Sequence, residues 1–304
     1  MKLDLKHLSD EVSDQEVLIL GICRNVENDL QSDIRRLLAA FSDFSKVHFR
    51  IVESDSNDST LIVLEKLSAQ IPNFEYVSYG NLQLEIPSRV ERIAYCRNKC
   101  LELMRSDVRL RDCSYVAVGD LDGVNSRLNR KSVLSCWIRD DWDACTANQL
   151  GPYYDIYALR HTEWSPDDCW RYEAQLLKKG MNPISAREKA VYSRQRKIPA
   201  SSPWINVDSA FGGLAIYKRE SLENATYSGL DLNGEEICEH VTLHTAMKAD
   251  GRKLYINPRL INDEWNEHSK ANMAWPRVKR LIKLILYRLL VSEKLRKKLP
   301  FKLF

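Results

Sequence analysis

The sequence of 304 residues lacks several features that mark special classes of protein. No stretch approaches the roughly eighteen uncharged apolar residues of a membrane-spanning helix, and residues 1–16 lack the apolar run of a secretory signal. The eight cysteines form no C-x-x-C pair, and the chain is too large to need disulfide staples. There is no internal repeat or low-complexity segment. We therefore expect a cytoplasmic globular protein with reduced, buried thiols.

Basic residues are unevenly distributed along the chain. Residues 275–304 hold ten Lys or Arg and one Glu, a net charge of +9, whereas residues 1–274 hold 35 basic and 41 acidic side chains, a net charge of −6. A nucleic-acid-binding domain would carry its basic stripe on the folded body, so this distribution argues against nucleic acid as a partner.

Short apolar runs alternate with segments of helical periodicity, which predicts βαβ units and a mostly parallel sheet. The predicted strands are 17–23, 48–53, 74–77, 115–118, 143–148, 210–217 and 253–256; the predicted helices are 26–44, 61–70, 90–110, 130–138 and 235–250. Residues 151–203 are rich in Trp, Tyr, Pro and Asp, and we expect a long, ordered, irregular segment that faces a substrate.

Polar clusters follow four of the predicted strands: Arg24 with Asn25, residues 53–58, Asp120 with Asp122, and the loop after Ile256. Ligands of open α/β sheets bind beyond the carboxyl ends of the strands, so these clusters predict a site. Asp120 and Asp122 directly follow the run YVAVG, and two such carboxylates can bind a hard cation such as Mn²⁺ or Mg²⁺.

The segments VESDSNDST, RIAYCRN, YVAVGDLDG, YYDIYALR, AFGGLAIYK and CEHVTLH occur in this order. Their order resembles the nucleotide-sugar-dependent glycosyltransferases of the GT-A fold, and is most similar to the fungal capsule-associated mannosyltransferases and their bacterial relatives. The resemblance covers residues 17–270. It implies a Rossmann-like α/β fold with a mixed, mostly parallel sheet flanked by helices. A nucleotide-binding half would span about 17–125, and an acceptor-binding half about 126–270, with residues 1–16 as an extension.

The resemblance also implies roles for single residues. Glu53 would contact the nucleobase of a UDP- or GDP-sugar, and Arg24 would belong to the same nucleotide site. Arg92, Arg97 and Asn98 would face the diphosphate and sugar. Asp120 and Asp122 would hold the divalent cation on the two phosphates, where metal and arginines neutralise charge on the departing nucleoside diphosphate.

Two further residues complete the implied site. Glu239 lies where many such enzymes place a carboxylate facing the acceptor hydroxyl, and it would act as general base if the reaction inverts configuration. The alternative is a first-turn acidic residue that interacts favourably with a helix dipole. His268 fits a downstream metal-binding histidine, with His244 as its competitor.

Other residues permit two interpretations. Gly212 and Gly213 allow either a close approach of a sugar to the backbone or a bulge. Tyr154, Asp155 and Arg160 resemble a segment near the sugar, but a structural Arg–Asp pair explains them equally well.

Residues 271–304 form a basic tail. At 100° per residue, the apolar side chains of 276–291 gather on one side and the basic ones on the other. This pattern predicts an interfacial helix on an anionic membrane surface; the alternative is a helix packed on the domain.

Together these features predict a metal-dependent glycosyltransferase, a hexosyltransferase most similar to mannosyltransferases, peripheral on the cytoplasmic face of the membrane. The acceptor would be a polysaccharide or lipid-linked glycan in capsule or lipopolysaccharide synthesis. One alternative is a sugar nucleotidyltransferase, but the glycine- and basic-rich signature expected after its first strand is absent. Another is an inactive membrane-bound scaffold. Donor, acceptor and stereochemistry stay open.

Overall fold

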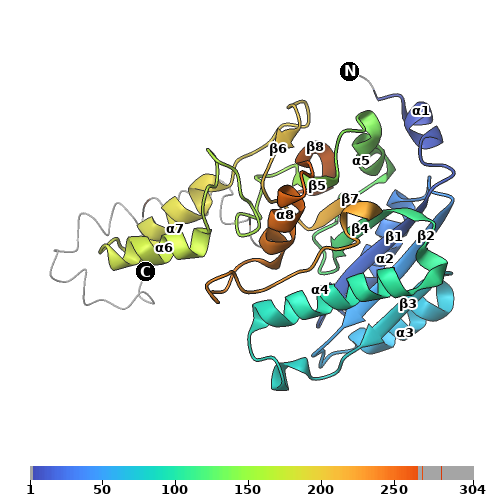
Figure 1. Ribbon diagram of the computed structural model, residues 1–304, viewed down its shortest axis with the longest axis horizontal. Helices are drawn as coiled ribbons and strands as arrows, with labels where there is room; N and C mark the ends of the chain where they lie inside the picture. The colour runs from blue at the N-terminus through green and yellow to red at the C-terminus, as the bar shows by residue number, and fades with distance from the viewer. Residues whose placement is uncertain (1–2, 266–268, 270–281, 283–304) are drawn as a thin grey trace.

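One sheet of eight strands organises the part of the chain that the computed structural model describes, residues 3–265, 269 and 282. Its strand order is β3-β2-β1-β4-β7-β5-β8-β6 (Figure 1). The strands are β1 (Glu16–Cys23), β2 (Lys46–Glu53), β3 (Phe74–Ser78), β4 (Cys113–Asp120), β5 (Ala144–Gln149), β6 (Ile205–Asn206), β7 (Leu214–Lys218) and β8 (Leu254–Asp263).

The strand directions confirm the predicted mixed, mostly parallel sheet. β3, β2, β1 and β4 are mutually parallel, and β5 pairs with β8 in parallel. β7 is antiparallel to both β4 and β5, so β5 and β8 run in the same direction as β4. The carboxyl ends of β1, β2, β4, β5 and β8 therefore meet at one edge of the sheet, which is where the polar clusters were expected.

Helices cover both faces of the sheet, and each face has its own apolar core. α4 (Arg89–Ser106) and α8 (Glu239–Ala249) cover one face, and α1 (Leu5–Asp10), α2 (Leu30–Ala40), α3 (Thr60–Gln70) and α5 (Arg130–Leu134) the other. Because both faces are covered, β1 is buried along almost its whole length, as its unbroken apolar sequence predicts.

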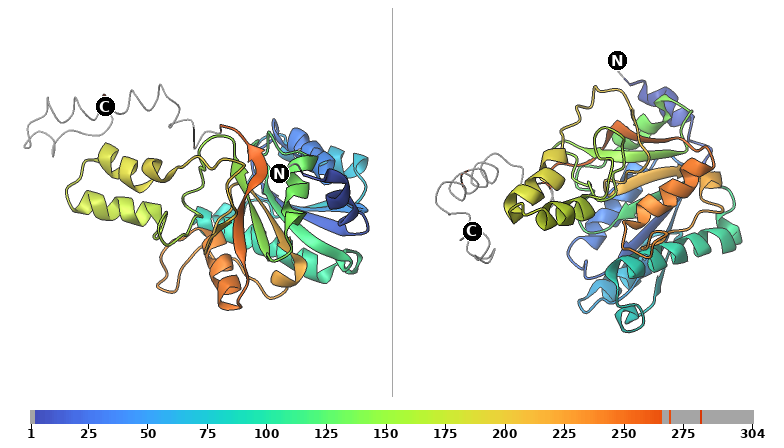
Figure 2. Two further views of the ribbon diagram at one scale, coloured as in Figure 1. Left: turned by 90° about the horizontal axis from the view of Figure 1, so that it is seen from above. Right: turned by 60° about the vertical axis from the view of Figure 1, so that its left-hand side comes forward.

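The expected irregular segment 151–203 contains two helices, which corrects that prediction. α6 (Cys169–Lys178) and α7 (Pro183–Ala190) form a hairpin that projects from the body of the sheet (Figure 2). Each begins at a side-chain cap: Asp168 accepts from the amides of Trp170 and Arg171, and Asn182 accepts from that of Ser185. The Asp and Pro residues that look like loop signals are N-terminal helix signals here.

The bounds of several elements also differ from those predicted from the sequence pattern. The predicted helix 26–44 is helical only over α2, because turns flank it on both sides. β7 starts at Leu214 because Gly212 and Gly213 before it have φ of 73° and 85°. β8 extends to Asp263, so no loop follows Ile256, and the polar residues at this edge are instead Asn262 and Asp263.

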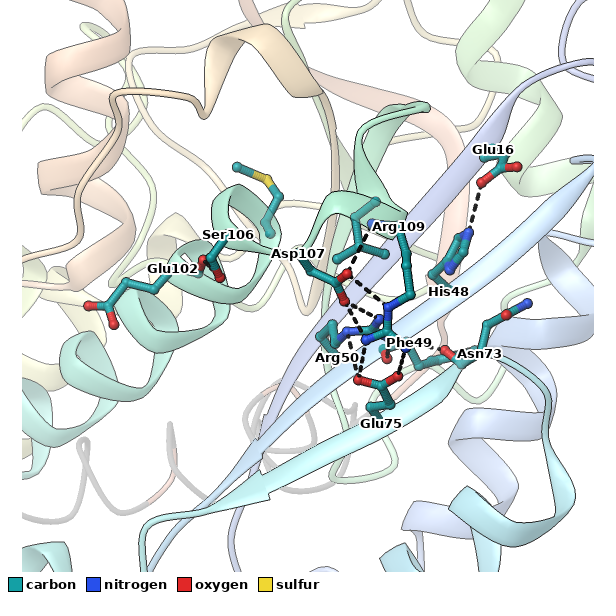
Figure 3. Close-up of polar contacts among 12 residues, drawn as sticks. Glu16, His48, Phe49, Arg50, Asn73, Glu75, Glu102, Ser106, Asp107 and Arg109 are labelled. Carbon is teal, nitrogen blue, oxygen red and sulfur yellow. Dashed lines mark hydrogen bonds and ion pairs between the residues drawn. The ribbon is translucent and has the colours of Figure 1, made fainter.

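Away from the cluster-bearing edge, ion pairs join β2, β3 and the residues that follow α4 (Figure 3). The buried guanidinium of Arg50 donates to Asp107 at 2.6 Å and lies 3.5 Å from Glu75. Arg109 contacts the same two carboxylates, and hydrogen bonds from Arg109 and Arg50, which outweigh burial, hold the pKa of Asp107 well below its usual range. Because Arg50 and Arg109 each pair with both carboxylates, we interpret this network as structural.

Ligand atoms of Glu16, His48 and Cys113 lie within 4.8 Å of one another on β1, β2 and β4. Lys46 pairs with Glu16 at 2.6 Å, and burial raises the pKa of the Cys113 thiol to about 12. Since His48 Nε2 also lies 2.8 Å from Glu16 Oε2, Glu16 is already paired with Lys46 and His48, and we interpret the group as polar contacts within the core.

Two predictions fall outside the described residues: His268, and the tail 271–304 with its amphipathic segment 276–291. Within the described part, no helix has the length and apolar character needed to cross a membrane.

Candidate functional site

A cavity of about 800 Å³ opens at the carboxyl edge of the sheet. Its lining comes from the ends of β1, β2 and β4, from α4, from the α6–α7 hairpin and from the start of α8. The predicted site residues that line it are Arg24, Arg92, Arg97, Asp120, Asp122 and Glu239. The fold thus brings together side chains up to 215 positions apart in the sequence, as sheet topology predicts.

Arg97 on α4 joins two of these carboxylates. Its Nε donates to Glu239 Oε1 at 2.9 Å and its Nη2 to Asp120 Oδ1 at 3.0 Å. The guanidinium lies 5.1 Å from the ring centroid of Phe211, and Arg97 is only 5% exposed. Burial disfavours its charge, but Glu239 and Asp120 outweigh burial and raise its pKa. Arg97 is therefore a fixed positive charge between α8 and the D-x-D motif, which is formed by residues 120–122.

Negative charge accumulates at the end of β4. Burial, and then the carboxylates of Asp122 and Asp155, raise the pKa of Asp120 to about 7, although Arg97 opposes this shift. The carboxylate oxygens of Asp120 and Asp122 are hard ligands that line the same cavity. These residues fit a divalent cation of the Mg²⁺ or Mn²⁺ type. The third predicted ligand, His268, lies outside the described residues.

Asp33 on α2 supports the D-x-D loop from behind, a role that the sequence analysis missed. It is fully buried, and its Oδ2 accepts from the Gly123 amide at 2.8 Å. Burial raises the pKa of Asp33 to about 6, although the Gly123 bond and Arg36 oppose this. The sequence does contain a signal for this role, because Asp33 is an acidic residue on the apolar side of the predicted helix 26–44.

We expect the folded state to bind the Asp33 proton more tightly than the unfolded state, whose carboxyl has the ordinary pKa of 3.8. The Asp33 contribution to the free energy of unfolding then falls as pH rises, with about 1.5 kcal/mol of that loss between pH 5 and pH 8. Asp33→Asn removes this dependence. The measurement is urea unfolding of both proteins at pH 5 and at pH 8. From pH 5 to pH 8, the free energy of unfolding of Asp33→Asn should rise by about 1.5 kcal/mol relative to that of wild type. A difference that stays constant with pH would contradict this role.

On the expected nucleotide side, Asp55 lines the cavity and Glu53 does not. Glu53 is 1% exposed, and its carboxylate accepts from the Ser56 amide and the Ser78 hydroxyl. It is absent from the cavity lining found among the described residues, which instead includes Asp55 with φ of 61°. Glu53 therefore braces the loop, and its contact with the base stays a prediction.

Two arginines hold Asp55 in place. Arg24 Nε donates to the Asp55 carbonyl oxygen at 3.2 Å, and Arg92 Nε lies 3.4 Å from Asp55 Oδ2. Arg92 also donates through Nη1 to the carbonyl oxygens of Ile86 and Pro87, both at 2.7 Å. Both arginines thus line the cavity while also ordering the loop.

The side chain of Asn98 binds the backbone of Tyr227. Its side chain donates to the carbonyl and accepts from the amide of Tyr227, both at 2.8 Å. Both polar atoms of Asn98 are used by this clamp, and the residue is not among those lining the cavity in the described structure. Asn98 thus has a structural contact here, and its expected role at the diphosphate and sugar stays a prediction.

The structure also shows where the segment 154–160 and the glycine pair lie relative to the cavity. Tyr154 and Asp155 line the cavity, whereas Arg160 pairs with Asp168 at 2.9 Å. The Gly212 amide donates to Asp155 Oδ2 at 2.9 Å. A Cβ on Gly213 would lie 2.7 Å from Val124 Cγ2, so the glycine pair serves a tight, positive-φ turn before β7.

The histidines of α8 differ sharply. His244 is fully buried, with Nδ1 3.0 Å from the Ser209 hydroxyl and Nε2 2.8 Å from the Tyr217 hydroxyl. Both of its ring nitrogens are occupied, which leaves none for a metal. His240 lines the cavity beside Glu239.

No protein-family model matches the chain, and no curated protein sequence matches it. Among solved structures it is similar to the mannosyltransferase PcManGT from Pyrobaculum calidifontis in complex with GDP-Man and Mn²⁺, with 14% identity, 95% of this chain and 70% of that chain covered, and a TM-score of 0.48. Glucosyl-3-phosphoglycerate synthase from Mycobacterium tuberculosis with UDP gives 11% identity, 96% and 87% coverage, and a TM-score of 0.43.

TarS from S. aureus in complex with UDP-GlcNAc gives 13% identity, 93% and 69% coverage, and a TM-score of 0.46. At these low identities and TM-scores, the likeness assigns neither a family nor an activity to this chain.

Proposed function

We propose that the chain is a glycosyltransferase that uses a nucleotide-sugar donor and a divalent cation. The observation that carries the proposal is that Asp120, Asp122, Arg97 and Glu239 line one cavity, in which Arg97 donates to both Asp120 and Glu239. This arrangement offers a cation site, a fixed positive charge and a carboxylate beyond it. The motifs YVAVGDLDG and RIAYCRN, which resemble GT-A enzymes, support the same assignment.

The cation-binding residues would be Asp120 and Asp122, and bound Mn²⁺ or Mg²⁺ would neutralise charge on the donor diphosphate. Arg97 supplies a second positive charge at the cavity. Asp55 joins Glu53 as a residue proposed to contact the base, because Asp55 lines the cavity.

Glu239 is the proposed general base. It begins α8, where the positive end of the helix dipole favours a carboxylate. Oε1 is held by Arg97, while Oε2 accepts a weak bond from the Cys238 thiol at 3.7 Å. Oε2 can take the proton of an acceptor hydroxyl that enters the cavity, which suits an inverting transfer.

We further propose an acceptor on a surface polysaccharide or lipid-linked glycan, with a mannosyl donor as the first to test and contact with the cytoplasmic face of the membrane. The support is the basic, amphipathic pattern of residues 271–304 together with the resemblance to capsule-associated enzymes.

The test is a screen of UDP-, GDP- and CMP-sugars with Mn²⁺ and with EDTA, read as released nucleoside diphosphate. We expect release from UDP- or GDP-sugars that EDTA abolishes. Release of pyrophosphate from a sugar phosphate and a nucleoside triphosphate would identify a nucleotidyltransferase instead. Binding of the tail to anionic vesicles, with no nucleotide or metal bound to the protein, would identify a scaffold.

A further inference from the structure

The imidazole of His240 is a buried polar group without a hydrogen-bond partner in the described part of the chain. It is 2% exposed, and neither ring nitrogen forms a hydrogen bond with any residue from 3 to 265. Nε2 lies 3.5 Å from Glu239 Oε1 but makes no hydrogen bond with it. A buried, unsatisfied polar group costs about 1–3 kcal/mol, so its retention beside the cavity needs an explanation.

Aromatic packing, rather than hydrogen bonding, fixes the position of this ring. His240 stacks on Phe211 with centroids 3.7 Å apart and planes at 19°, and meets Tyr227 edge-on at 5.6 Å. His244, 5.9 Å away, has both of its nitrogens occupied. The contrast within one helix shows that the core could satisfy a histidine, and that it leaves the cavity-lining one unsatisfied.

The His240 ring is neutral. Burial, and then the charges of Arg97 and His244, hold its pKa well below the usual range. A neutral imidazole has one N–H donor and one nitrogen acceptor, which matches a hydroxyl group, itself both donor and acceptor. Arg97, the cation nearest this end of the cavity, is already shared by the carboxylates of Glu239 and Asp120, which disfavours a further anionic ligand such as phosphate beside His240.

Aromatic side chains on the facing loop and hairpin narrow the ligand class. Tyr157 and Trp170 line the same cavity with ring centroids 6.3 Å apart, and Trp170 is 41% exposed. A pyranose ring presents hydroxyl groups at its rim and an apolar C–H face, so it can use both the imidazole and an aromatic wall.

We propose that His240 binds a hydroxyl group of a neutral sugar ring beside Glu239, which makes this end of the cavity the acceptor subsite. The sugar-binding role stands on the geometry of His240. Only the assignment of this sugar as the acceptor rests on the proposed function.

The experiment is ligand-observed saturation-transfer NMR with methyl α-D-mannopyranoside, methyl β-D-glucopyranoside and methyl β-D-galactopyranoside, with Mg²⁺ and UDP or GDP present. His240→Phe keeps an aromatic stack on Phe211 and removes both nitrogens. His240→Gln restores one donor and one acceptor. His244→Gln is the matched control, because it alters the neighbouring histidine that faces the core.

We expect wild type to bind at least one glycoside, His240→Phe to bind it about tenfold more weakly, and His240→Gln to recover part of the affinity. His244→Gln should lower thermal stability and keep glycoside binding. Nucleotide affinity should be equal in wild type and both His240 variants. If His240 were only structural, a substitution that weakens glycoside binding would disturb nucleotide binding as well. His240→Leu gives the same test if the Phe variant fails to fold.

Two results would overturn the inference: no glycoside bound by wild type, or equal binding by His240→Phe. Failure of the proposed function would look different. Wild type would then bind neither UDP nor GDP with Mg²⁺, while the glycoside signals would still decide the role of His240.

Discussion

Glu239→Gln is expected to lower kcat for sugar transfer by about 10²–10⁴-fold, the usual contribution of a general base. The substitution is conservative in shape, and the amide oxygen can still accept from Arg97 Nε, which contacts Glu239 Oε1 at 2.9 Å in the wild type. The Asp120–Arg97 pair should therefore stay in place, and nucleotide affinity should change little. Only the proton acceptor for the incoming hydroxyl is lost.

The measurement is nucleoside diphosphate release with a methyl glycoside or water as acceptor, paired with calorimetric nucleotide binding. Glu236→Gln is the matched control, because Glu236 lines the same cavity and accepts from the Ser88 hydroxyl at 2.7 Å. We expect this control to retain kcat. Equal turnover by wild type and Glu239→Gln would reduce Glu239 to a first-turn residue that stabilises α8.

Asp122→Asn is expected to lower turnover by at least about 100-fold, since even outer-shell changes at metal sites cost up to that factor. Asp122 is an exposed member of the cavity wall, so its loss should not unfold the protein. Removing one carboxylate weakens cation binding, and the variant should need more Mn²⁺ for its residual activity. The measurement is turnover as a function of Mn²⁺ concentration.

Asp29→Asn is the control for Asp122→Asn. Asp29 Oδ1 lies near the same loop, 3.1 Å from where a Cβ on Gly123 would stand, but Asp29 does not line the cavity. We expect it to keep the metal dependence of the wild type. Metal-independent turnover, equal in wild type and Asp122→Asn, would contradict the assignment of the D-x-D motif.

Local patterns predicted much of this fold because the parallel strands are buried on both faces. The run VLILGIC and the run YVAVG became β1 and β4, and the rule that ligands bind beyond parallel strands placed Asp120 at the cavity. The side chains of α4 were harder to assign. Arg97 and Asn98 are adjacent, yet one faces the cavity and the other clamps Tyr227, because neighbouring helical residues point about 100° apart.

Other features depend on tertiary contacts that no short pattern contains. Glu53 and Asp55 look equivalent in VESDSNDST, but the positive φ at Asp55 turns the loop so that Glu53 braces it from within. The pairing of Arg97 with Glu239 spans 142 positions. The caps at Asp168 and Asn182 lie within 151–203, where Asp, Asn and Pro predict turns as readily as helix starts.

The most direct test of the central claim is calorimetric titration of UDP and GDP into wild type and Asp122→Asn, with Mn²⁺ and with EDTA. The metal-assisted donor site predicts that wild type binds one of the two nucleotides with Mn²⁺ and loses about 100-fold or more in affinity with EDTA or with Asp122→Asn. Nucleotide affinity that is the same in all of these conditions, or no binding of either nucleotide, would contradict it.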